Sequence, residues 1–126
     1  MEQPAVTEDA QKTILVVDDD ESVLSFVSGL LARRNYSVIT AKSGAEALRQ
    51  SRCYKSDIHL LLADFQMPEM SGLDLGTQVS LERPHIKVLL MSGYTNGMLV
   101  LNQGWQFITK PFIPSQLCAL VSGLIG

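Results

Sequence analysis

Five side chains in this sequence could share one piece of chemistry: Asp18, Asp19, Asp64, Ser92 and Lys110, each of which follows a short apolar run. Carboxylates supply the hard oxygen ligands that suit Mg²⁺ or Mn²⁺. A lysine and a hydroxyl can bind the oxygens of a phosphoryl group, and an aspartate oxygen can attack its phosphorus. Together, these residue types predict a metal-assisted site for a tetrahedral anion.

Converging carboxylates repel one another and need a counter-charge. At about 4 Å and an effective dielectric near 20, two of them cost on the order of 4 kcal/mol. A proton, a divalent cation or the Lys110 amine could each offset this repulsion. The adjacent Asp20 and Glu21 are interpreted differently, as solvated residues that complement a helix dipole.

The apolar runs before these residues predict buried strands. We expect strands at residues 14–17, 37–40, 60–63, 88–91 and 107–109. The first helix is expected to start at an N-cap Ser22 and to bury an apolar face that includes Leu24, Phe26 and Val27. Ser43 and Glu46 form a capping box for the second helix. A third helix carries residues 73–79, and Pro114 opens the last.

Alternating strands and helices predict an α/β fold with a parallel sheet covered by helices on both faces. In such sheets functional groups collect at the carboxyl ends of the strands. We therefore expect the five polar residues to meet at one edge.

The composition fits one compact domain of 126 residues, with 46% hydrophobic residues and a net charge of −3. Residues 1–12 are expected to form a flexible polar tail and residues 13–126 the domain. The absence of a basic run argues against direct nucleic-acid binding, and no apolar run is long enough for a membrane span. The tail lacks the apolar core of a signal peptide, and Cys53 and Cys118 suit a reducing setting, so a cytoplasmic location is expected.

Four stretches together resemble the CheY-like receiver domain of two-component response regulators. They are I-L-V-V-D-D-D-E-S (residues 14–22), L-L-A-D-F-Q-M-P-E-M-S-G (61–72), L-L-M-S-G-Y (89–94) and F-I-T-K-P-F (107–112). The resemblance implies a doubly wound five-stranded sheet in the order 2-1-3-4-5. It also implies a cis bond between Lys110 and Pro111.

The resemblance also implies a role for each matching residue. Asp64 would accept the phosphoryl group, with Lys110 and Ser92 binding it. Asp19, Asp64 and the backbone carbonyl of Gln66 would hold Mg²⁺ or Mn²⁺ directly, and Asp18 would act through water. Ser92 and Phe107 would form the switch, while Gln66 and Tyr94 would tune the lifetime of the phosphoryl group.

By the same resemblance, the partners would be a histidine kinase or a histidine phosphotransfer protein, and a weak homodimer is allowed. The domain would catalyse only its own phosphorylation and dephosphorylation, so it would not be an enzyme in the usual sense. No nucleic-acid or membrane contact is expected.

The sequence departs from the usual receiver in two places. The stretch from Ser92 to Lys110 lacks about one helical turn, so the fourth helix should be short, shifted or partly unwound. Ile113 stands where relatives often have a capping residue, so the last helix should be poorly capped.

Three alternatives stay open from the residues alone. A degenerate receiver would only dock partners. A haloacid-dehalogenase-like phosphatase shares the aspartate nucleophile, and Asp18, Asp20 and Ser22 loosely match its first motif. It needs a further acidic pair after the lysine, and no acid follows Lys110. A flavodoxin-like protein would need a phosphate-binding loop where this chain has acids.

Overall fold

The computed structural model describes residues 11–93 and 105–126, and strands and helices alternate in it as far as Ser92. The order is β1 (Thr13–Val17), α2 (Glu21–Arg33), β2 (Ser37–Ala41), α3 (Gly44–Cys53), β3 (Leu60–Asp64), α4 (Gly72–Glu82), β4 (Lys87–Ser92), β5 (Trp105–Thr109) and α5 (Pro114–Ile125). All five predicted strands are present, each longer than predicted by one or two residues. Residues 1–10 of the predicted tail at 1–12 lie outside the described residues, as do Tyr94 and the place of the fourth helix.

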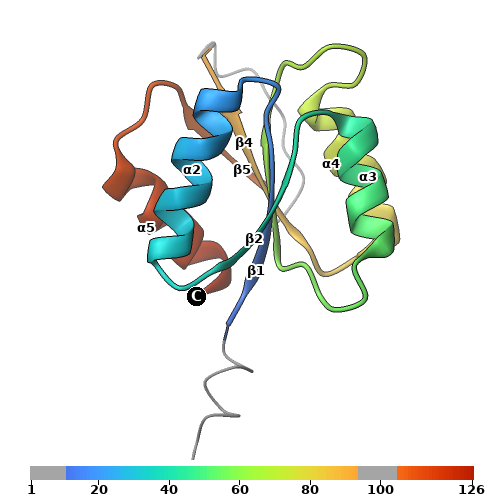
Figure 1. Cartoon of the computed structure of the whole chain (residues 1–126), viewed down its shortest axis with the longest axis horizontal. Helices are drawn as coiled ribbons and strands as arrows, with labels where there is room; N and C mark the ends of the chain where they lie inside the picture. The colour runs from blue at the N-terminus through green and yellow to red at the C-terminus, as the bar shows by residue number, and fades with distance from the viewer. Residues whose placement is uncertain (1–10, 94–104) are drawn as a thin grey trace, which may run out of the picture.

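The five strands form one parallel sheet in the order β2-β1-β3-β4-β5, which confirms the predicted fold. Helices α2 and α5 cover one face, and α3 and α4 cover the other (Figure 1). Residues 14–17 of β1 are all fully buried because helices pack on both sides of the strand. Burying each such side chain contributes about 1.5–3 kcal/mol, so the apolar strands form a firm base for the residues at their ends.

The helix starts follow local hydrogen bonding, and one differs from the prediction. Asp20, not Ser22, is the N-cap of α2, and its carboxylate accepts from the backbone N–H groups of Ser22 and Val23. Both residue types make good caps, and the carboxylate two positions earlier also binds the Ser22 hydroxyl at 2.7 Å. Ile113 before α5 makes no side-chain cap, as predicted.

Phe26 was predicted to lie on the buried face of α2, and that prediction is wrong. The buried residues of α2 are Leu24, Val27, Leu30 and Leu31, whereas Phe26 is 47% exposed. At 100° per residue, position 26 lies about 200° around the helix from Leu24, which turns it away from the sheet. An aromatic side chain is therefore left in solvent near the start of α2.

Three other residues have packing or structural roles. Trp105 is buried and Tyr54 packs against the α3–α4 side of the sheet. The Nδ1 atom of His59 accepts a hydrogen bond from the Thr13 backbone N–H at 3.0 Å, next to the bond from His59 N–H to the Thr13 carbonyl. The imidazole thus adds one rung to the pairing between β1 and β3. No helix in the described part of the chain is long and apolar enough to cross a membrane.

Arg83 ties the end of α4 to the end of α3. Its guanidinium donates to the Ser51 hydroxyl at 3.0 Å and to the backbone carbonyls of Ser51, Tyr54 and Ser56 at 2.8–3.0 Å. The carbonyls at a helix C-terminus otherwise lack partners, and a cation there also complements the helix dipole. Arg83 therefore holds the chain reversal that leads into β3.

We expect Arg83→Ala to lower the free energy of unfolding by about 2 kcal/mol, because it leaves several partly buried carbonyls without a donor. Urea denaturation followed by circular dichroism measures this loss. Arg52→Ala is the matched control: Arg52 also links α3 to α4, but through an exposed ion pair with Glu82, and should cost under about 1 kcal/mol. Equal losses in the two variants would contradict the role of Arg83.

Candidate functional site

Three strands end in the charged residues of the candidate site. Asp18 follows β1, Asp64 ends β3, and Lys110 follows β5. Ser92 ends β4 between them, and its backbone carbonyl accepts from the Lys110 N–H at 2.7 Å. The structure thus brings four of the predicted residues to the carboxyl edge of the sheet, where the alternation of strands and helices predicts them.

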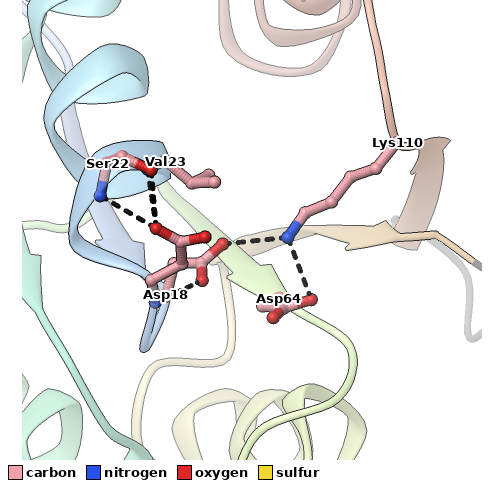
Figure 2. Close-up of polar contacts among 6 residues, drawn as sticks. Asp18, Ser22, Val23, Asp64 and Lys110 are labelled. Atoms are coloured by element: carbon pink, nitrogen blue, oxygen red, sulfur yellow. Dashed lines mark hydrogen bonds and ion pairs between the residues drawn. The ribbon is translucent and has the colours of Figure 1, made fainter.

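Lys110 lies between two carboxylates (Figure 2). Its Nζ atom is 3.1 Å from Oδ2 of Asp18 and 3.4 Å from Oδ1 of Asp64. The Asp18 side chain is fully buried, and the side chains of Asp64 and Lys110 are 13% and 24% exposed. One amine therefore neutralises part of a charge cluster that is mostly shielded from water.

Asp18 and Asp19 occupy different environments although they are neighbours. Both oxygens of Asp18 already have partners, because Oδ1 accepts from the Asp20 N–H at 2.9 Å and Oδ2 faces Lys110. Asp19 is exposed. Its carboxylate is the more open of the two toward an incoming ligand.

The donor set fits a hard divalent cation. Asp18, Asp19 and Asp64 each offer a carboxylate oxygen, and these oxygens lie within 4.8 Å of one another. Two unit charges at that separation repel by roughly 3 kcal/mol at an effective dielectric near 20. Carboxylates of this number and spacing suit Mg²⁺ or Mn²⁺ with some waters retained, so the acidic triad can bind a metal.

The pKa values of the paired groups follow from burial and charge. Burial, and then the negative charge of Asp18, raises the pKa of Asp64 above its ordinary value, while Lys110 and the Gln66 backbone N–H act against this rise. For Lys110, burial opposes the charged form, but hydrogen bonding and the charges of Asp18 and Asp64 prevail and raise its pKa. Lys110 therefore stays cationic, whereas the ionised form of Asp64 is less favourable here than it is for an exposed aspartate.

The loop after Asp64 is held close by Gly72. Its N–H donates to the Phe65 carbonyl at 2.9 Å, and a Cβ at position 72 would lie 2.3 Å from the Asp64 carbonyl oxygen. Only glycine permits this approach of α4 to the end of β3. Gln66, which lies in this loop, is exposed.

Phe107 lies on β5, three residues before Lys110. It is half-buried and packs against the α3–α4 side of the sheet. The bond between Lys110 and Pro111 is cis, as the resemblance implies.

A groove that was not predicted from the sequence opens beside Lys110. It has a volume of about 460 Å³ and is lined by Ser22, Val23 and Phe26 of α2 and by Lys110, Pro111 and Phe112. Ile113, next to Phe112, is 64% exposed. The signal that could have revealed the groove is the phase of Phe26, which does not fit the buried stripe of α2.

Comparisons with known proteins agree with this geometry. The model of the response regulator receiver domain family matches residues 14–122. The alkaline phosphatase synthesis transcriptional regulatory protein PhoP of Bacillus subtilis is 32% identical over 90% of this chain and 48% of its own length. Sensor kinase CckA of Brucella abortus is 31% identical over 90% of this chain and 12% of the kinase.

Solved structures show the same fold. The response regulator protein TrrA of Thermotoga maritima, crystallised in complex with Mg²⁺-BeF, superposes with a TM-score of 0.80. The two are 27% identical, and the match covers 90% of this chain and 99% of that one. By contrast, this chain spans less than half the length of the first curated relatives that it matches, 48% of PhoP and 22% of the transcriptional regulatory protein GlrR of Escherichia coli.

The raised pKa of Asp64 predicts a pH-dependent stability effect. When the pKa of a carboxyl is higher in the folded state than in the unfolded state, the folded state becomes less stable as the carboxyl ionises. For Asp64 this loss occurs as pH rises from the ordinary pKa of 3.8 through the raised pKa. Without metal at neutral pH, Asp64→Asn should therefore raise the melting temperature, and the gain should vanish below pH 3.8.

Thermal unfolding in EDTA across this pH range provides the measurement. Asp74→Asn, which changes an exposed acid in the first turn of α4, is the control and should shift stability by less than about 0.5 kcal/mol. A neutral-pH destabilisation by Asp64→Asn would show that Lys110 more than compensates the charge of Asp64.

Proposed function

The chain belongs to the response regulator receiver domain family, and from this membership we propose that Asp64 accepts a phosphoryl group from the phosphohistidine of a two-component partner. That partner is a histidine kinase or a histidine phosphotransfer protein. The observation that carries the proposal is the Lys110 bridge between Asp18 and Asp64 inside the acidic triad. Such an acidic pocket is typical of phospho-accepting receivers.

Phosphoryl transfer begins at the Asp64 carboxylate. One of its oxygens attacks phosphorus in line with the bond to the donor imidazole. The new P–O bond forms as the P–N bond breaks, and the electron pair of that bond stays on the imidazole nitrogen. Lys110 then pairs with a phosphoryl oxygen, and the Ser92 hydroxyl donates to another.

A bound Mg²⁺ or Mn²⁺ would supply positive charge to the phosphoryl oxygens. We expect Asp19, Asp64 and the backbone carbonyl of Gln66 to hold it directly. Asp18 would act through a bound water, because its two oxygens already accept from Lys110 and the Asp20 N–H.

The product is a protein state and not a released compound. Drawing Ser92 toward the phosphoryl group makes room for Phe107 to move inward. This movement shifts the population between two conformations of the surface around β5. Water later attacks phosphorus, releases inorganic phosphate and restores Asp64, with Gln66 and Tyr94 tuning that step. Receivers are generally not true enzymes, and this one would act only on its own phosphoryl group.

The first test uses the full chain with Mg²⁺ and acetyl phosphate. We expect intact-mass spectrometry to detect the addition of one phosphoryl group, and Mg²⁺ with beryllofluoride to change the fluorescence of Trp105. This indole is the chain's single tryptophan and lies on β5 two residues before Phe107. Asp64→Asn should abolish both signals, Lys110→Ala should slow phosphorylation by about a hundredfold, and the exposed Asp74→Asn should leave it unchanged.

Each negative result has a distinct meaning. Absence of any Mg²⁺-dependent signal would indicate a docking-only receiver. A signal that survives Asp64→Asn would show that another residue accepts the phosphoryl group, which contradicts the role of Asp64. Steady turnover of simple phosphomonoesters would instead favour the phosphatase alternative.

The groove beside Lys110 supports a docking place for the donor protein. Exposed large apolar side chains mark interaction surfaces. Here the exposed Phe26 and the partly buried Phe112 line the same groove as Lys110, whose amine faces Asp64. A donor helix seated there would carry its phosphohistidine toward the acidic triad.

We expect Phe26→Ser to slow transfer from a phosphohistidine protein about tenfold, because truncating an apolar anchor removes part of the docking energy. Acetyl phosphate presents no protein surface, so its rate should not change. Leu81→Ser is the matched control, since Leu81 is 79% exposed on α4, on the other face of the sheet. Loss of both reactions in Phe26→Ser would assign Phe26 to folding instead.

A further inference from the structure

A second cleft lies at the opposite edge of the sheet from Asp64, where the strands begin. It has a volume of about 570 Å³ and lies between the end of α5 and the loop that joins α4 to β4. In Figure 1 this edge is at the lower end of the molecule, beside the marked C-terminus. The phosphoryl chemistry proposed above uses none of its lining residues.

Arg83 lines the cleft and carries a positive charge that is held in a fixed place. The Arg83 guanidinium is held by four neutral acceptors, the Ser51 hydroxyl and three backbone carbonyls. These bonds fix its place without cancelling its charge. The neighbouring Glu82 is already neutralised by Arg52, with N···O distances of 2.7–3.2 Å.

Two lysines add to this charge. Lys12 precedes β1 and Lys87 begins β4, and both line the cleft. Within residues 11–93 and 105–126 neither lysine forms an ion pair. Apart from the paired Glu82, Asp57 is the only acid among the lining residues. The cleft is therefore locally positive in a chain whose net charge is −3.

The remaining lining is apolar, with two imidazoles. Leu124 and Ile125 at the end of α5 offer partly exposed apolar surface, and Ile58 and Ile86 form a nearly buried floor. His59 and His85 also line the cleft. Because Nδ1 of His59 accepts from the Thr13 N–H, the proton of the neutral ring resides on Nε2, which is then a donor. An aliphatic wall beside cationic and N–H donor groups complements a ligand that carries both carboxylates and aliphatic side chains.

We propose that this cleft docks an acidic, aliphatic peptide segment of a partner protein. Its carboxylates would face Lys12 and Lys87, and its aliphatic side chains would pack on the partly exposed Leu124 and Ile125 at the end of α5. The volume lies within the range of about 300–1,000 Å³ that is usual for ligand sites. The site is separate from the acidic triad, so docking and phosphorylation can occur on the same molecule.

The test uses the full chain and a fluorescein-labelled decapeptide of alternating glutamate and leucine. Fluorescence anisotropy should show saturable binding that weakens as salt is raised. Amide resonances of His85, Lys87 and Ile58 should shift in ¹H–¹⁵N spectra. Lys12→Glu and Lys87→Glu should each weaken binding about fivefold, because reversal replaces an attraction with a repulsion. Arg49→Glu makes the same charge change on the exposed surface of α3 and should leave affinity within about twofold.

Five results would overturn the proposal. Four of them are absence of saturable binding, equal binding of a peptide in which lysine replaces glutamate, equal loss in Arg49→Glu, and resonance shifts confined to the acidic triad. The fifth is complete displacement of the peptide by inorganic phosphate at the same concentration of negative charge, because the cleft would then be a site for small anions. Mg²⁺-dependent phosphorylation of Lys87→Glu should remain normal, which separates this test from that of Asp64.

Discussion

Repulsion between carboxylates at the carboxyl edge of the sheet is the constraint on which the rest of the structure depends. Asp18 is fully buried and Asp64 nearly so, and the only described cation that contacts both is Lys110. Because β4 lies between β3 and β5, a side chain after β5 must cross roughly 10 Å to reach Asp64. A long, flexible lysine spans such a gap where a shorter side chain would not, which explains the residue type at position 110.

The bridge in turn needs strands that end in register. Asp64 pairs with Met91, Ser92 pairs with Thr109, and the Lys110 N–H continues the ladder to the Ser92 carbonyl. Apolar packing on both faces fixes this register, since a shift of one residue would turn buried side chains toward the wrong helix layer. Gly72 adds a local restraint by letting α4 approach the end of β3. The polar site is therefore positioned by apolar residues that take no part in its chemistry.

The same reasoning explains what could be predicted from the sequence. Strands buried on both faces give short continuous apolar runs, and Asp18, Asp64, Ser92 and Lys110 stand out because each run stops at a polar residue. The N-cap of α2 was misassigned because Asp20 and Ser22 are both capable caps, and hydrogen-bond geometry decides between them. The exposure of Phe26 follows from helical phase, which a count of apolar residues ignores. The cleft at the edge where the strands begin could not be predicted from the sequence, because Lys12, Arg83 and Lys87 come together only after the sheet has formed.

Charge balance also indicates how the proposed phosphorylation would act. In the structure Lys110 is shared between Asp18 and Asp64, and its raised pKa keeps it cationic. A phosphoryl group would add negative charge at Asp64, so the attraction of Lys110 to that side would exceed its attraction to Asp18. A bound cation would then offset the remaining repulsion among the carboxylates. A population shift requires a difference in free energy between two states. Here that difference would come from the new partners of Lys110 and Ser92, together with the surface that half-buried Phe107 still exposes and would bury on moving inward.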